Sequence, residues 1–110
     1  MKILIIRFSS IGDIVLTTPV ISYAKKLLHA EVHYLTKKKY SSVLEGNPNI
    51  DKLILFDGDL KKIIELLRKN NYDLIVDLHN NLRTRIIKFQ LNIPHKSVNK
   101  FNFSKGKLLI

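Results

Sequence analysis

An aliphatic run that ends in a polar turn, followed by an amphipathic stretch, is the feature that most constrains this chain. Residues 3–6 read ILII, residues 9–13 read SSIGD, and apolar side chains then recur at helical spacing up to residue 28. A continuous aliphatic run is typical of a strand covered on both faces, and the 3.6-residue spacing predicts a helix with one buried face. We therefore predict a buried strand, a tight loop and a helix. In open α/β sheets, ligands bind at the edge where such loops lie.

The helix predicted after this loop has an irregular beginning. Ser10 and Asp13 are both candidates for its N-cap, with the first helical residues near position 12. Pro19 is tolerated in a first turn, but deeper in a helix it removes a hydrogen bond and causes a kink. The junction is therefore not expected to be a regular helix. The predicted apolar face consists of Ile14, Thr17, Ile21, Ala24 and Leu28.

The rest of the chain alternates between strand and helix patterns. Strands are predicted at residues 31–36, 52–56, 73–78 and 96–99, and helices at residues 37–46, 60–70 and 82–91. The segment 101–110 fits either a helix that begins at Leu108 or a linker. Because parallel strands are joined by right-handed crossovers, this alternation predicts a parallel sheet. We predict an α/β fold in one domain, residues 1–110: a Rossmann-like parallel sheet of order 3-2-1-4-5 with flanking helices.

Charge is the unusual part of the composition. Nineteen Lys and Arg residues against nine Asp and Glu give a formal net charge of +10, which predicts an anionic partner or membrane surface, although most of these side chains solvate helix faces. The chain has no cysteine, which excludes disulfides and thiolate chemistry, and no apolar run approaches the length of a membrane span or signal peptide. We predict a cytoplasmic protein that is peripheral to the membrane.

Polar residues that follow the first and fourth predicted strands should meet in one crevice. In the predicted strand order these two strands are neighbours, so their exit loops lie side by side at the switch point. The crevice residues are Asp13, His79, Asn80, Asn81 and Arg83. Spacing alone favours a helix N-cap for Asp13, worth about 1 kcal/mol, and the functional alternative is a general base for a hydroxyl group.

The other candidate motifs carry weaker signals. The first loop has one glycine, Gly12, which permits close backbone approach to a ligand, but it is neither a dinucleotide fingerprint nor a P-loop. No second His or Asp lies at metal-ligand spacing from His79, so we expect no metal site. Asp77 is expected to anchor neighbouring loops. Arg83 and Arg85 could clamp a phosphate or carboxylate, although a solvated helix face is as good a reading for Arg85.

Two segments of the chain resemble glycosyltransferase family 9, the bacterial lipopolysaccharide heptosyltransferases. Residues 7–19 follow the pattern R-x-S-S-I-G-D-I-V-x-T-x-P. Residues 72–89, YDLIVDLHNNLRTRIIKF, resemble the second block of the family, Y-D-x-x-x-D-L-Q-x-x-x-R-S, with His79 in place of the usual Gln. Residues 96–103 are similar to the stretch that follows the fifth strand. The resemblance implies the N-terminal, acceptor-binding half of a GT-B fold, with the nucleotide-sugar domain outside this chain.

The resemblance also implies a reaction and its residues. Members transfer heptose from ADP-heptose to a Kdo-lipid A or inner-core acceptor with inversion, and the proposed catalytic base falls on Asp13. The acceptor-contacting arginine falls on Arg83. No metal and no cofactor is implied, and the acceptor places the enzyme at the cytoplasmic surface of the inner membrane. The acceptor-binding set that we predict is Ser9, Ser10, Gly12, His79, Asn80, Asn81, Arg83 and Arg85.

Three other functions remain open on sequence alone. The first is transfer of a different sugar, since the missing domain would select the donor. The second is a non-catalytic basic α/β domain that binds an anionic glycolipid or nucleic acid, but the aromatic residues show no stacking pattern interleaved with basic ones, so no nucleic acid is expected. The third is a receiver-like signalling domain, for which residues 7–9 lack the required acidic pair.

Overall fold

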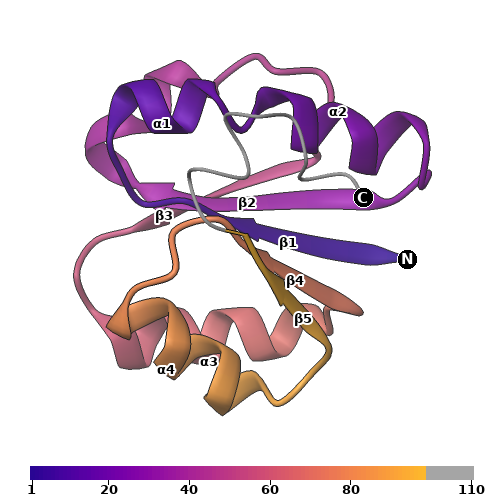
Figure 1. Cartoon of the computed structure of the whole chain (residues 1–110). Helices are drawn as coiled ribbons and strands as arrows, with labels where there is room; N and C mark the ends of the chain where they lie inside the picture. Colours follow the sequence, from indigo (N-terminus) through magenta and orange to yellow (C-terminus); the bar gives the residue numbers. More distant parts are fainter. Residues whose placement is uncertain (99–110) are drawn as a thin grey trace.

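The computed structural model describes residues 1–98, which form a five-stranded parallel sheet in the order β3-β2-β1-β4-β5 (Figure 1). The predicted α/β class and strand order are confirmed. The strands are β1 Lys2–Ile6, β2 Glu31–Lys37, β3 Lys52–Phe56, β4 Leu74–Asp77 and β5 His95–Ser97. The helices are α1 Ile11–Val15, α2 Thr18–Lys26, the 3₁₀ helix η1 Lys38–Val43, α3 Leu60–Asn70 and α4 Leu82–Leu91.

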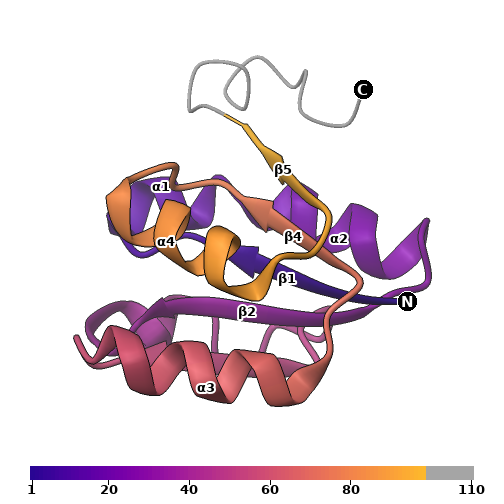
Figure 2. The same cartoon turned by 90° about the horizontal axis from the view of Figure 1, so that it is seen from below.

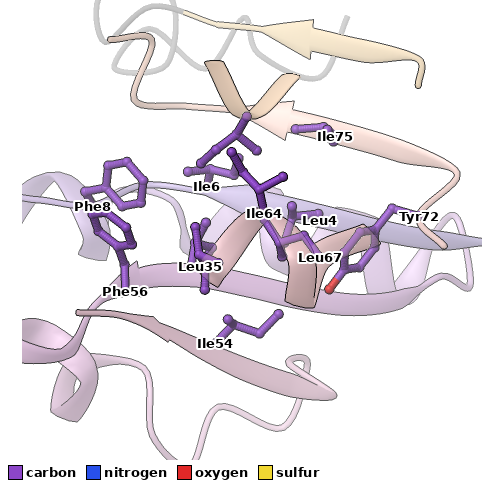
Figure 3. Packing of buried hydrophobic residues seen from close by; sticks show 12 residues of the cluster. Leu4, Ile6, Phe8, Leu35, Ile54, Phe56, Ile64, Leu67, Tyr72 and Ile75 are labelled. Atoms are coloured by element: carbon purple, nitrogen blue, oxygen red, sulfur yellow. The ribbon is translucent and has the colours of Figure 1, made fainter. Parts of the chain in front are cut away.

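Helices cover the sheet on both faces. In Figure 1, α1 and α2 lie above the sheet, and α3 and α4 lie below it. Figure 2 shows the same fold turned by 90°, with α3 and α4 toward the viewer. Arg68 of α3 donates to the backbone and side-chain oxygens of Gln90 on α4. The central strand β1 supplies both cores, since successive side chains of a strand point to opposite faces. Leu4 and Ile6 pack in the cluster drawn in Figure 3, whereas Ile3 and Ile5 pack under α2.

The single helix predicted after the first loop is instead two helices, α1 and α2. The break falls at Thr17, whose buried hydroxyl group lies 2.6 Å from the carbonyl oxygen of Ile14 and 2.8 Å from the hydroxyl of Tyr34. Pro19 then occupies the first turn of α2, where its missing N–H costs no hydrogen bond. Leu28 lies beyond α2 and is 43% exposed, so its assignment to the buried face was wrong.

Other boundaries agree with the sequence or shift slightly. The helices predicted at residues 60–70 and 82–91 are confirmed as α3 and α4, and the segment predicted as a helix at 37–46 holds the shorter η1. The fifth strand begins and ends earlier than the predicted residues 96–99. The helix-or-linker prediction for residues 101–110 lies outside the described residues. Among the described helices, none combines the length and the hydropathy that crossing a membrane requires.

Candidate functional site

The first loop places Asp13 at the carboxyl end of β1, inside the first turn of α1. Ser10 occupies the N-cap position, yet its side chain makes no capping hydrogen bond. Its hydroxyl group instead donates to Asp13 Oδ2 at 3.1 Å. The prediction that Asp13 is the N-cap was therefore wrong, because the carboxylate lies three residues further along. Side-chain contacts with Ser10 and Arg7 hold Asp13 at the crevice.

Arg7 binds Asp13 and was missed by the sequence reasoning. Its Nη2 atom lies 2.9 Å from Asp13 Oδ2, and the two side chains are only 13% and 15% exposed. Its Nη1 atom donates to the carbonyl oxygen of Leu78 at 2.8 Å. The sequence did contain a signal for this ion pair, because Arg7 is the single charged residue between Lys2 and Asp13. Local spacing assigned it only to the end of the strand.

Asp77 anchors the second crevice loop, as the sequence predicted. Its Oδ1 atom accepts the backbone N–H groups of His79 at 3.0 Å and Asn80 at 2.8 Å. Its Oδ2 atom lies 3.0 Å from Lys88 Nζ, which also donates to Ser97 Oγ at 2.6 Å. Asp77 is completely buried, so this ion pair compensates a charge that could not otherwise remain inside the fold.

His79 enters the crevice from this anchored loop. Its ring packs against Phe8, with ring centroids 5.2 Å apart. Burial lowers the pKa of His79, and the positive charge of Arg7 lowers it further, while the acidic groups Asp77 and Asp13 oppose this shift. The imidazole is therefore neutral at neutral pH. Its Nδ1 atom is buried and has no hydrogen-bond partner among the described residues.

The two asparagines of the same loop have different surroundings. Asn81 Oδ1 accepts the backbone N–H of Thr84 at 2.9 Å, and Thr84 Oγ1 accepts the N–H of Asn81 at 2.9 Å. This reciprocal capping box begins α4 and occupies the side chain of Asn81. Asn80 is exposed and adopts a left-handed backbone with φ 58°, which asparagine tolerates.

Arg83 lies in a separate basic pocket. Its guanidinium carbon lies 5.5 Å from the centre of the Phe56 ring, which in turn stacks on Phe8 at 5.1 Å. The cavity has a volume of about 450 Å³. It is lined by Lys37, Lys38, Lys39, Phe56, Asp57, Gly58 and Arg83. Because four of these residues are cationic and one is acidic, the pocket favours an anion.

The other residues of the predicted acceptor-binding set are Gly12, Arg85 and Ser9. Gly12 is exposed, and a Cβ atom at this position would meet nothing within 4 Å, so the fold itself does not require glycine there. Arg85 is exposed on α4 and lies outside the basic pocket, and Ser9 is half-buried in the first loop. Among residues 1–98, no group of three or more His, Asp or Glu side chains could hold a metal ion.

The structure therefore places an acid–base cluster in the crevice and an anion pocket apart from it. Asp13, Ser10 and His79 are brought together around Arg7, at the carboxyl ends of β1 and β4. Arg83 faces the lysines that follow β2. A carboxylate held beside a neutral imidazole can accept a proton from a hydroxyl group, while the neighbouring cations bind acidic parts of the same ligand.

Known proteins with similar sequences are heptosyltransferases. The chain is 36% identical over 115 residues to lipopolysaccharide heptosyltransferase 1 of Campylobacter coli, a match that covers 98% of this chain and 32% of that protein. It is 35% identical over 92 residues to lipopolysaccharide heptosyltransferase 3 of Escherichia coli, covering 74% of this chain and 27% of the relative. The chain thus spans about a third of the length of the curated relatives it matches. No family model matches the chain.

Solved structures give the same result for the fold. A glycosyl transferase of family 9 from Veillonella parvula superposes with a TM-score of 0.79 at 27% identity, over 94% of this chain and 33% of that one. The Escherichia coli ADP-heptose lps heptosyltransferase II superposes with a TM-score of 0.76 at 23% identity, over 90% of this chain and 30% of that one. By sequence and by fold, the chain is therefore similar to heptosyltransferases of glycosyltransferase family 9.

Proposed function

We propose that this chain is the N-terminal, acceptor-binding domain of an inverting glycosyltransferase with a GT-B fold, which transfers heptose from ADP-heptose to Kdo-lipid A or an inner-core acceptor. The observation that carries the proposal is the carboxylate of Asp13, held by Arg7 at the switch point of the sheet. The similarity of the chain to heptosyltransferases supports the reaction class. The nucleotide sugar binds a second domain, since the chain spans only 32% of the Campylobacter coli relative.

In this mechanism Asp13 acts as a general base. It removes the proton of an acceptor hydroxyl group while that oxygen attacks the anomeric carbon of the donor, and ADP leaves from the opposite face. Attack from the face opposite the leaving group inverts the anomeric centre. The neutral imidazole of His79, on the loop after β4, is assigned to contact with the acceptor sugar. No metal or cofactor takes part in these steps.

The basic pocket binds the acidic part of the acceptor. Carboxylate and phosphate groups match the guanidinium of Arg83 and the neighbouring lysines. The net charge of +10 attracts the protein to an anionic membrane surface, which is where a lipid-linked acceptor is found. We place the enzyme in the cytoplasm, peripheral to the inner membrane.

The Arg83→Met variant should bind the phosphorylated acceptor less tightly. Losing a charge-assisted hydrogen bond at this exposed position is expected to raise KM for the acceptor about tenfold, with a smaller change in kcat. The effect should shrink at high salt, because screening weakens the same contact in the unaltered enzyme. Lys52→Met, at the exposed amino end of β3, is the matched control. Equal KM values for the two variants would show that Arg83 does not bind the acceptor.

Transfer by the complete gene product tests the function itself. Incubated with ADP-heptose and Kdo-lipid A, it should add one heptosyl residue to the acceptor, as measured by mass spectrometry of the lipid. Transfer of another sugar from its nucleotide would retain the enzyme class and change the donor. Binding of Kdo-lipid A without transfer from any nucleotide sugar would contradict the proposal and favour a non-catalytic glycolipid-binding domain, for which the basic pocket is sufficient.

A further inference from the structure

We propose that Arg7 is the positioning residue of this site: its guanidinium group fixes the orientation of the Asp13 carboxylate and ties the two loops of the crevice together. The inference rests on the proposed function of Asp13 as the base. It assigns to Arg7 a role in the reaction without contact to the acceptor.

The contacts of Arg7 reach three neighbouring segments. Its backbone N–H donates to the carbonyl oxygen of Leu35 on β2 at 3.1 Å. Its Nη1 atom donates to Leu78 at the end of β4, and its Nη2 atom binds Asp13 on α1. The planar guanidinium group therefore links the loops after β1 and β4 through two different nitrogen atoms. With 13% of its side chain exposed, Arg7 has little freedom to rotate away.

Charge explains why an arginine is needed here. The groups around Asp13 include Arg7 at the end of β1, the Ser10 hydroxyl in its own loop and His79 from the loop after β4. Lys37 at the end of β2 and Asp77 at the end of β4 also act electrostatically on His79. The helix α1 has only five residues, so it offers a smaller dipole than the long helix that the sequence predicted. Arg7 therefore supplies the positive charge beside this carboxylate, with its Nη2 atom 2.9 Å from Asp13 Oδ2.

Lysine and methionine at position 7 separate the two contributions of this side chain. Arg7→Lys keeps a positive charge but presents a single ammonium group, which cannot reproduce the planar two-nitrogen link to Asp13 and Leu78. Arg7→Met removes the charge and keeps an apolar stem of similar length. Lys25→Met is the matched control, because it breaks another short ion pair, the 2.6 Å contact with Asp51, outside the crevice loops.

The first measurement needs no catalysis. The carboxyl carbon of Asp13 is followed by NMR during a pH titration of the 110-residue chain, with Asp13→Asn assigning the signal. In Arg7→Met the midpoint should rise by about one pH unit or more, because losing an opposite charge disfavours the ionised form. Arg7→Lys and Lys25→Met should titrate near the unaltered chain. An unchanged midpoint in a folded Arg7→Met variant overturns the proposal, and if that variant does not fold, Arg7→Gln replaces it.

The second measurement is the pH profile of kcat/KM in the complete gene product. The acidic limb should move to higher pH in Arg7→Met, since it reports the base of the free enzyme. In Arg7→Lys the limb should stay in place while kcat falls by about 10²-fold, the cost of a misplaced reacting group. Full kcat in Arg7→Lys would refute the positioning role. A protein without transferase activity would contradict the proposed function, and the NMR titration would still decide whether Arg7 controls Asp13.

Discussion

Replacing Asp13 by asparagine is expected to lower kcat for sugar transfer by about 10²–10⁴-fold, the usual contribution of a general base. Asparagine has nearly the same shape, and its amide oxygen can still accept from Arg7 and Ser10, which both contact Oδ2 of the aspartate. It cannot take a proton from the acceptor hydroxyl group. Because the fold and the acceptor pocket remain, KM for the acceptor should change little.

The control for this experiment is an acidic residue away from the crevice. Glu45→Gln removes one negative charge from an exposed side chain between η1 and β3, and should leave kcat unchanged. Both variants are compared with the unaltered enzyme in the same transfer assay, at saturating donor. Normal turnover by Asp13→Asn would refute the assignment of the base while leaving the family and the fold in place.

Replacing Asp77 by alanine should cost about 3–5 kcal/mol in the free energy of unfolding, which is the range for breaking a buried ion pair from one side. The side chain of Lys88, only 9% exposed, would keep its charge without its partner 3.0 Å away. The backbone N–H groups of His79 and Asn80 would lose their acceptor as well. Because the free energy of unfolding of a natural domain is about 5–15 kcal/mol, much of the stability would be lost.

Urea unfolding of three variants separates the two losses. Asp77→Asn retains Oδ1 as an acceptor for the loop but leaves Lys88 unpaired, so it should be less destabilised than Asp77→Ala. Adding Lys88→Met to Asp77→Asn removes the stranded charge and should restore part of the stability. If Asp77→Ala unfolds within about 1 kcal/mol of the unaltered domain, the ion pair is not a structural anchor.

Much of the fold follows from local pattern. Aliphatic runs marked the strands, and helical spacing marked α3 and α4. Their alternation predicted a parallel sheet, and the order expected of a Rossmann-like half is confirmed. The division between α1 and α2 was less accessible, because it depends on Thr17 contacting Tyr34 from β2. The short η1 fills the loop before Gly46, where helical spacing alone does not distinguish a 3₁₀ helix from an α-helix.

The site was predictable in its residues but not in its contacts. Strand order placed Asp13 and His79 at one crevice, and the structure brings both near Arg7. The pairing of Arg7 with Asp13 was within reach of the sequence, but its contact with Leu78 was not, because Leu78 lies 71 positions away and no local pattern reports such a contact. For Asn81 the loop position was right, but its side chain caps α4, a role that depends on the reciprocal hydrogen bonds with Thr84.

The order of the strands in the sheet has a consequence for co-translational folding. The central strand β1 is synthesised first, yet its neighbour β4 follows about 70 residues later, as the separation of 71 between Lys2 and Asp73 shows. Until then one edge of an aliphatic strand has no partner, which exposes the nascent chain to aggregation and to chaperones. The link from Arg7 to Leu78 closes with the same step. The crevice is therefore assembled only when β4 docks against β1.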